Sequence, residues 1–348
     1  MSPLGRAARV LICDDSPTYA NALSRLLGEG DELDVVEICP SAEEALAALP
    51  RAKPDLVTMD LHLPGMSGLE AVEQIMGTSP LPILVISSQI ASRDSTVVAA
   101  ALAAGALDAL SKDDLALRDP AGPDGAALRQ RVRLLSGVHV IRHPRASLAA
   151  RRPPARPPTR ACSVVGICTS TGGPPALAAV LRELPPTYPI PILVVQHIAA
   201  GFVEGFAKWL GGEIRLPVAL ATNGQALSRG VWVAPDEAHL LLSRNGWLEL
   251  DRDGSPLPFR PSGDVLLRSI ADAAGRTAAG VVLTGMGKDG ADGLAAIRAA
   301  GGSTVAQDEA TSAVYGMPRA AAQSAELILP LDEIGARLTA LKPVEEPS

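Results

Sequence analysis

Ser170, His197 and Asp289 each follow an apolar run in the second half of the chain, and they are the residue types of a nucleophile, a general base and an orienting acid. A serine at a turn from strand to helix is exposed, and the N–H groups of the helix can stabilise an oxyanion. Pro174 and Pro175 favour the first turn of such a helix. The chain order Ser, His, Asp is allowed, since a triad is defined by geometry. The pattern predicts a serine hydrolase, although Ser170 alone can be a helix cap and His197 alone a packed histidine.

The loop that contains Asp289 has a second interpretation. Residues 285–290 read Gly-Met-Gly-Lys-Asp-Gly, which fits the dinucleotide-binding pattern GxGxxG between a strand and a helix. Asp308 lies 18 residues beyond Gly290, near the spacing of the acid that binds the ribose hydroxyls. A nucleotide-binding oxidoreductase is therefore one alternative function, although it leaves Ser170 and His197 without a role. A non-catalytic two-component adaptor is the other alternative.

Three carboxylates, a hydroxyl and an ammonium group follow the apolar runs of the first part of the chain. Asp14 and Asp15 follow the first run, Asp60 the third, Ser87 the fourth and Lys112 the fifth. The carboxyl ends of parallel strands meet at one crevice, so we expect these five side chains to lie together. Neighbouring carboxylates repel unless a hard cation neutralises them, and oxygen ligands suit Mg²⁺. A carboxylate beside Mg²⁺ and a lysine can accept a phosphoryl group, because both cations stabilise the charge in transfer.

The elements that must position these residues form two parallel sheets. Apolar runs alternate with Ala- and Leu-rich helical segments in both halves, which predicts an α/β fold with two doubly wound parallel-sheet domains, the first flavodoxin-like and the second Rossmann-like. The expected strands are 9–13, 34–39, 56–59, 83–86 and 106–110, then 163–167, 190–196, 231–234, 280–283, 303–306 and 327–329. A Pro- and Arg-rich segment separates the halves. We predict a first domain over 1–136, a linker over 137–160 and a second domain over 161–344.

The composition argues against several classes of protein. A net charge of −7 and a pI near 5.3 argue against a nucleic-acid partner. No apolar run approaches the roughly 20 residues that span a membrane, and the first run ends at Asp14, so we expect neither membrane insertion nor a signal peptide. The four cysteines lack CxxC spacing and are expected to be reduced and packed. These features indicate a cytoplasmic protein.

The segment 60–69, Asp-Leu-His-Leu-Pro-Gly-Met-Ser-Gly-Leu, resembles the phosphoacceptor segment of the response-regulator receiver domain. The resemblance implies that Asp60 is the phosphorylation site. The residues that it implies around Mg²⁺ are Asp14, Asp15, Asp60 and, through its carbonyl, His62. Those that it implies at the phosphoryl group are Ser87 and Lys112.

Two residues depart from the receiver pattern. Ala109 stands where an aromatic switch residue is usual, and Asp113 stands where a proline usually follows the lysine. The departures concern how phosphorylation is communicated, whereas the residues of the acidic pocket itself match.

Residues 161–330 closely resemble the catalytic domain of the chemotaxis response regulator protein-glutamate methylesterase family. The matching segments are 170–173, 194–197, 233–235, 260–262, 283–290, 306–311 and 316–318. The resemblance implies that Ser170 is the nucleophile, His197 the base and Asp289 the orienting acid, with no catalytic metal. It also implies that the Met286 amide belongs to the oxyanion hole and that Thr171 lies beside the nucleophile. The departure is Cys168-Thr169, where the family usually has Gly-Ala.

The two resemblances together imply a phosphorylation-regulated hydrolase of chemotaxis adaptation. Its substrates would be glutamyl methyl esters on methyl-accepting chemoreceptors, and deamidation of glutamines is a further activity that the resemblance allows. The expected partners are these chemoreceptors and a chemotaxis histidine kinase that phosphorylates Asp60.

Overall fold

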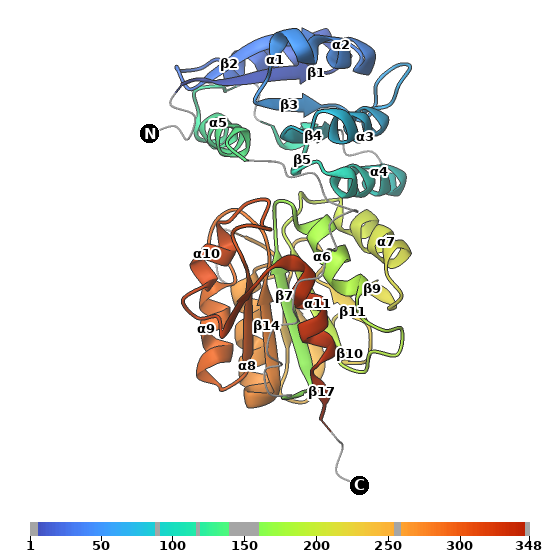
Figure 1. Cartoon of the computed structure of the whole chain (residues 1–348), viewed down its shortest axis with the longest axis vertical. Helices are drawn as coiled ribbons and strands as arrows, with labels where there is room; N and C mark the ends of the chain where they lie inside the picture. Colours follow the sequence, from blue (N-terminus) through green and yellow to red (C-terminus); the bar gives the residue numbers. More distant parts are fainter. Residues whose placement is uncertain (1–5, 88–90, 116–118, 139–159, 254–258, 345–348) are drawn as a thin grey trace. The chain divides into compact units, whose positions relative to one another are not determined.

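The chain divides into two compact units, Met1–His143 and Pro144–Ser348 (Figure 1). The computed structural model describes residues 6–87, 91–115, 119–138, 160–253 and 259–344, and of 91–95 and 114 the backbone alone. Each unit is described here by itself. Most of the linker predicted at 137–160 lies outside the described residues, so its extent remains a prediction.

The first unit contains a five-stranded parallel sheet with the strand order β2-β1-β3-β4-β5. The strands are β1 (Ala8–Cys13), β2 (Leu33–Cys39), β3 (Leu56–Met59), β4 (Ile83–Ser87) and β5 (Asp108–Ser111). Strands β3 and β4 are buried along their whole length, as expected of a sheet covered on both faces. The order confirms the flavodoxin-like, doubly wound prediction.

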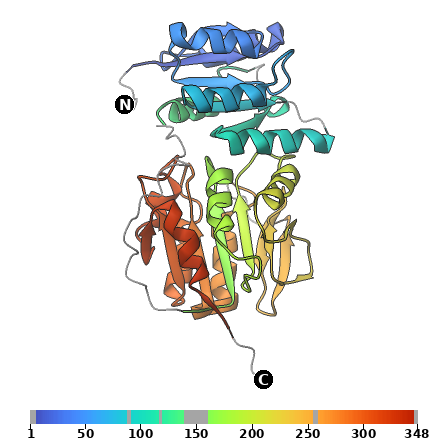
Figure 2. The same ribbon diagram turned by 45° about the vertical axis from the view of Figure 1, so that its right-hand side comes forward.

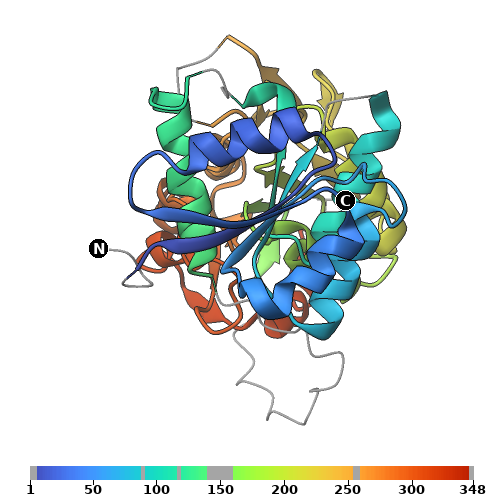
Figure 3. The same cartoon turned by 90° about the horizontal axis from the view of Figure 1, so that it is seen from above.

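Helices cover both faces of this sheet. Seen from above, α1 (Pro17–Leu27) and α5 (Pro123–Ser136) lie on one face (Figure 3). The helices α2 (Ala42–Ala52), α3 (Gly68–Thr78) and α4 (Ala91–Ala104) lie on the other. Local sequence fixes where the helices begin, because Ser16 caps α1 and Ser67 forms a capping box with Glu70 at α3. These starts place the strand-to-helix turns at one edge of the sheet.

The second unit contains a seven-stranded parallel sheet with the order β16-β15-β14-β7-β8-β11-β9. Its strands are β7 (Val164–Thr169), β8 (Ile192–Gln196), β9 (Val218–Leu220), β11 (Val231–Val233), β14 (Ala278–Val282), β15 (Ser303–Gln307) and β16 (Leu327–Leu329). The chain builds outward from β7 in one direction and then returns to add β14 on its other side. The strand order therefore reverses between β7 and β14, which is where α/β sheets bind ligands.

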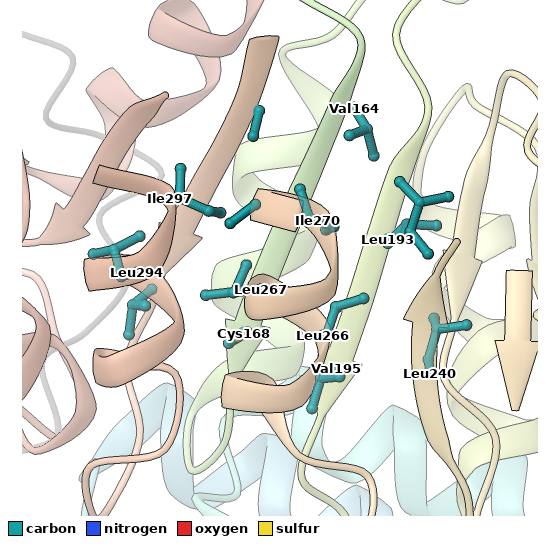
Figure 4. Packing of buried hydrophobic residues seen from close by; sticks show 14 of the residues in the cluster. Val164, Cys168, Leu193, Val195, Leu240, Leu266, Leu267, Ile270, Leu294 and Ile297 are labelled. Atoms are coloured by element: carbon teal, nitrogen blue, oxygen red, sulfur yellow. The ribbon is translucent and has the colours of Figure 1, made fainter. Parts of the chain in front are cut away.

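Helices flank this second sheet as well, and its core is aliphatic. The helices α6 (Gly173–Arg182) and α11 (Leu331–Thr339) lie side by side (Figures 1 and 2). Leu266, Leu267 and Ile270 of α8 (Gly263–Ala274) pack with Leu294 and Ile297 of α9 (Ala291–Ala299) against the sheet (Figure 4). Each fully buried aliphatic side chain of this kind contributes roughly 1.5–3 kcal/mol. The packing fits a chain with only 3% aromatic residues.

Several short elements of the second unit were not predicted from the sequence. They include α7 (Val203–Glu213), α10 (Met317–Ala321), the paired strands β6 (Ala161–Cys162) and β17 (Lys342–Pro343), and a three-stranded sheet of β10 (Gln225–Ala226), β13 (Trp247–Asp251) and β12 (His239–Leu242). Strands of two to five residues give little periodic signal. None of the described helices is long and apolar enough to cross a membrane.

Candidate active site

The three residues of the predicted triad follow neighbouring strands of the second sheet. Ser170 follows β7, His197 follows β8, and Asp289 lies in the loop between β14 and α9. The His197 N–H donates to the Thr169 carbonyl at 2.9 Å, so the nucleophile and base candidates continue paired strands. The loops after β7 and β14 lie on either side of the reversal in strand order.

His197 and Asp289 form a direct hydrogen bond. His197 Nε2 lies 2.8 Å from Asp289 Oδ2, and the two side chains are only 11% and 7% exposed. The other ring nitrogen, Nδ1, is buried and has no hydrogen-bond partner among the described residues. Nδ1 is therefore the ring nitrogen that is not bonded to Asp289, and no hydrogen bond joins it to Ser170. Such bonds are often long before substrate binds.

Asp289 is held as an anion by four hydrogen bonds. Besides His197, its donors are the Ser262 hydroxyl at 2.8 Å and the amides of Gly263 at 2.6 Å and Asp264 at 3.1 Å. The amides belong to the N-terminus of α8, where an anion is favoured. Burial alone would raise the pKa of Asp289, but His197 and these amides outweigh it and lower the pKa to about 2.

The side chain of Gln196 is hydrogen-bonded to the backbones of both Ser170 and His197. Its side-chain Nε2 donates to the Ser170 carbonyl at 2.9 Å and to the His197 carbonyl at 2.8 Å. Gln196 is 3% exposed, so these bonds lie out of water. On the other side, the Ser170 N–H donates to the Thr284 carbonyl at 3.1 Å. The turn that carries Ser170 is thus attached to both neighbouring strands.

The loop after β14 also lies against Ser170. A Cβ atom at Gly285 would come 2.8 Å from Ser170 Cβ, so the two backbones approach closely. The next residue, Met286, is half-buried, and its N–H donates to no acceptor in the described part of the chain. Thr171 is buried, and its carbonyl accepts from the Thr284 hydroxyl at 3.0 Å. An unused amide next to the serine is what an oxyanion hole needs.

Three further residues surround the triad and were not predicted to belong to it. Phe259 stacks on the His197 ring, with the centroids 4.7 Å apart and the planes 12° apart, and it covers one face of the imidazole. His239 is buried, and its Nδ1 accepts from the Ser262 N–H at 3.2 Å. Burial, together with the charge of Arg260, lowers the pKa of His239. Ser262 lies in a matching family segment, but nothing in the spacing of these residues gave them a role.

The acidic residues of the first unit also come together. Oxygen atoms of Asp14, Asp15 and Asp60 lie within 4.8 Å of one another, after β1 and β3. Oxygen-only donors at this spacing fit Mg²⁺. Lys112 Nζ lies 2.7 Å from Asp14 Oδ2 and 2.6 Å from Asp60 Oδ2, so one ammonium group joins two of the carboxylates. Ser87 is buried at the end of β4.

Burial and ion pairs act in opposite directions on the pKa values of Asp14 and Lys112 in this pocket. Burial raises the pKa of Asp14, because bonds from Lys112 and the Ser16 amide offset it only in part. Burial alone would lower the pKa of Lys112, but Asp14 and Asp60 outweigh it and raise that pKa. The other Asp60 oxygen accepts from the His62 N–H at 3.1 Å, and His62 Nδ1 lies 3.5 Å from Ser87 Oγ.

The two departures from the receiver pattern have local consequences. Ala109 is buried in β5, so a methyl group occupies the position of the usual switch ring. The Ser111 hydroxyl caps the short helix that begins at Lys112, because it accepts from the Asp113 N–H at 3.2 Å. A proline at position 113 would lack that donor.

The dinucleotide-binding interpretation of 285–290 is not favoured by the structure. The acid within the segment, Asp289, is bonded to His197 and to the start of α8. Asp308, the expected ribose ligand, accepts instead from the N–H and hydroxyl of Thr311 at 3.0 and 2.6 Å. Both acids are thus engaged within the protein.

Comparisons with known proteins agree with this arrangement. Residues 165–338 match the family model described as CheB methylesterase, and residues 10–116 match the response regulator receiver domain. Protein-glutamate methylesterase/protein-glutamine glutaminase 2 of Anaeromyxobacter dehalogenans (strain 2CP-C) is 46% identical over 94% of this chain and 95% of its own length. The corresponding protein 3 of Myxococcus xanthus (strain DK1622) is 45% identical over 91% of this chain and 88% of its own length.

A solved structure resembles the second unit. The CheB methylesterase catalytic domain of Thermotoga maritima is 35% identical, with a TM-score of 0.50, and the match covers 51% of this chain and 98% of that domain. The family model, the full-length relatives and this structure agree. The chain therefore belongs to the CheB methylesterase family, in the form that carries a response regulator receiver domain ahead of the catalytic domain.

Proposed function

We propose that this chain is a phosphorylation-regulated serine hydrolase that removes methyl esters from glutamyl side chains of chemoreceptors and deamidates their glutamines. The observation that carries the proposal is the 2.8 Å bond between His197 and Asp289 beside Ser170. The names of its relatives, protein-glutamate methylesterase/protein-glutamine glutaminase, supply the substrate class.

In the first half of the reaction Ser170 Oγ attacks the ester carbonyl. Its proton passes to His197 Nδ1, since Nε2 is bonded to Asp289. The Met286 amide and the adjacent start of α6 stabilise the oxyanion. The bond between the carbonyl carbon and the methoxy oxygen then breaks, and His197 gives its proton to that oxygen, which leaves as methanol. An acyl-enzyme on Ser170 remains.

In the second half a water molecule attacks the acyl-enzyme. His197 takes a proton from the water and returns it to Ser170 Oγ, which releases the glutamyl carboxylate. A glutamine follows the same path and releases ammonia in place of methanol. Asp289 stays ionised throughout, because its pKa of about 2 is far below neutral pH. The side chains of the chain supply every proton transfer without a metal.

The decisive experiment replaces the nucleophile. Ser170→Ala should lower methanol release from methylated chemoreceptors by about 10⁴-fold or more, because no covalent intermediate can form. Ser163→Ala is the matched control, since Ser163 lies before the same strand and bonds to Thr277 Oγ1 at 2.8 Å. Equal rates for Ser170→Ala and the wild type would contradict the proposal.

In the receiver, Asp60 is the phosphoacceptor and a histidine kinase the donor. Asp14, Asp15, Asp60 and the His62 carbonyl would hold Mg²⁺, which supplies positive charge for phosphoryl transfer. Lys112 and Ser87 contact the phosphoryl group. A histidine kinase and chemoreceptors would be its partners, and we place the protein in the cytoplasm.

Regulation can be tested without the kinase. Acetyl phosphate with Mg²⁺ should raise the rate of methanol release by the wild type, because the phosphorylated receiver shifts the population of the enzyme toward its active form. Asp60→Asn should keep the basal rate and lose the response. An unchanged wild-type rate in the presence of the phosphodonor would contradict the regulatory part of the proposal, but it would not contradict the hydrolase activity.

A further inference from the structure

The receiver unit contains a single benzene-type ring, that of Tyr19, and this ring lies against the lysine of the acidic pocket. Tyr19 is the only phenylalanine, tyrosine or tryptophan in residues 1–143. Lys112 Nζ lies 4.5 Å from the centroid of its ring, within the range of a cation–π interaction. The ring belongs to the first turn of α1, where the Tyr19 N–H donates to Ser16 Oγ. The ring therefore stands on a backbone that is already fixed.

The ring adds a third partner to the Lys112 ammonium. Two of its partners are Asp14 Oδ2 at 2.7 Å and Asp60 Oδ2 at 2.6 Å. A lysine side chain is long and flexible, so it does not hold its ammonium in one place unaided. If Asp14 takes another partner, the Tyr19 ring still restrains the ammonium close to Asp60.

The hydroxyl of Tyr19 does not explain why the ring lies there. It is buried and has no hydrogen-bond partner among the described residues, whereas a buried phenol usually has one. Among the described residues, the polar contact of the Tyr19 side chain is therefore the one between its ring face and the Lys112 ammonium. At the usual position of a receiver aromatic, Ala109 offers only a methyl group.

We propose that Tyr19 is a positioning residue for phosphoryl transfer to Asp60, and that its ring holds the Lys112 ammonium where the phosphoryl oxygens arrive. The proposal rests on the proposed phosphorylation of Asp60. It predicts that the ring is needed and that the hydroxyl is not.

The first test compares phosphorylation rates in the full chain with acetyl phosphate and Mg²⁺, using mass spectrometry to count the bound phosphate. Tyr19→Phe should remain within roughly twofold of the wild type, because it keeps the ring. Tyr19→Leu should be slower by about 2- to 30-fold, the range of a partly buried cation–π contact. Equal rates for Tyr19→Leu and the wild type overturn the proposal, and so does an equal loss in both variants. Asp60→Asn is the blank.

A second test keeps the shape of the side chain constant. Phenylalanines with one, two and three ring fluorines at position 19 weaken the ring face progressively without removing bulk, so folding is preserved. The phosphorylation rate should fall stepwise along this series. A flat series overturns the proposal.

The third measurement does not depend on phosphorylation. The chain has only five lysines, so the ammonium signal of Lys112 can be assigned by NMR. Its proton chemical shift should lie upfield because of the Tyr19 ring. It should move downfield in Tyr19→Leu, which lacks the ring, and stay upfield in Tyr19→Phe, which keeps it. If the Lys112 signal shifts as expected but the wild type gains no phosphate, the contact between Tyr19 and Lys112 is supported and the proposed phosphorylation of Asp60 is contradicted. A signal that ignores Tyr19→Leu overturns the contact.

Discussion

Both units place carboxylates at the ends of parallel strands, yet they leave them in different electrostatic states. In the catalytic unit, Asp289 accepts four hydrogen bonds, and its pKa falls to about 2. In the receiver, three carboxylates gather with Lys112 bonded to two of them, and burial raises the pKa of Asp14. One site has its donors in place, whereas the other contains more negative charge than its lysine can balance.

The difference corresponds to what each carboxylate has to do. A triad acid orients an imidazole and remains charged in every step, so fixed protein donors serve it best. A phosphoacceptor pocket must admit a metal ion and a phosphoryl group, and its donors, Lys112 and the amides of Ser16 and His62, leave part of its negative charge unbalanced. The same strand-end geometry therefore supports a fully bonded anion in one unit and a site with excess negative charge in the other.

The largest expected effect tests the closed site. Asp289→Asn should lower kcat by about 10³- to 10⁴-fold. The asparagine side chain is neutral and has only one acceptor oxygen, so it cannot replace the carboxylate that accepts from His197 and both helix amides. Methanol release measures the loss of kcat. Asp264→Asn is the control, since that carboxylate accepts from the Gly293 N–H at 2.8 Å and only its backbone contacts Asp289. A loss below tenfold in Asp289→Asn would mean that the fixed anion is not needed.

A smaller effect is expected from removing one donor. Ser262→Ala deletes the hydroxyl that bonds Asp289 Oδ1 and should lower kcat by roughly 10-fold, with KM little changed. It also removes the N-cap of α8, which costs about 1 kcal/mol of stability. Ser67→Ala removes an N-cap from α3 in the receiver and serves as the control for that loss. Comparable losses of kcat in the two variants would assign the effect to helix capping.

Much of both sites could be predicted from the sequence because their main residues follow apolar strands. The eight positions predicted in this way are Asp14, Asp15, Asp60, Ser87, Lys112, Ser170, His197 and Asp289. Parallel strands bring such positions to one edge of a sheet, so strand ends and residue types are enough to locate them. Family resemblance then separated the triad from the dinucleotide interpretation, which used the same loop.

The supporting residues could not be predicted in the same way. Gln196 is the buried last residue of β8, and its residue type does not indicate that its amide bonds to the backbones of Ser170 and His197. Ser262 reaches Asp289 across 27 residues of sequence, and Phe259 reaches His197 from the same segment. Tyr19 reads as an ordinary residue of an amphipathic helix. These roles depend on distances between elements, which neither periodicity nor spacing records.

The pH dependence of stability should differ between the two sites. Asp289 has a folded pKa of about 2 against an ordinary 3.8, so the native state binds fewer protons. Its stabilisation, about 2 kcal/mol, is complete above pH 4 and is lost as the pH falls toward 2. Asp14 has the opposite sign: its pKa is raised, so the native receiver binds more protons and loses stability as the pH rises through that pKa.

Calorimetry of the full chain at pH 6 and pH 3 can check both signs. Asp289→Asn should destabilise the catalytic unit more at pH 6 than at pH 3. Asp14→Asn should stabilise the receiver at pH 6, with a smaller gain at pH 3, because it removes a buried charge whose pKa is raised. If Asp14→Asn destabilises the receiver at pH 6, the bond of Asp14 to Lys112 outweighs the burial of its charge, and the contrast between the two sites fails.

The last prediction concerns Cys168, a departure from the family pattern that packs against Gly263 next to Asp289. Cys168 is fully buried, and a Cβ atom at Gly263 would lie 2.7 Å from its Sγ and 3.0 Å from its Cβ. The cysteine therefore fits only where residue 263 has no side chain. The Gly263 N–H also donates to Asp289 at 2.6 Å, so a shift of residue 263 would move Asp289. Gly263→Ala should therefore cost about 1–3 kcal/mol of stability and lower kcat, since Asp289 must shift.

A double-mutant cycle isolates that contact. Cys168→Ala removes the sulfur and should recover roughly 1 kcal/mol of the loss when combined with Gly263→Ala. Gly212→Ala is the control, because no atom of the described residues lies within 4 Å of a Cβ atom there. Alanine should stabilise α7 slightly, since helices prefer it to glycine. Chemical unfolding of the four chains gives the coupling energy. Strict additivity would show that position 263 is constrained by Asp289 or the backbone, and that the cysteine is accommodated without its help.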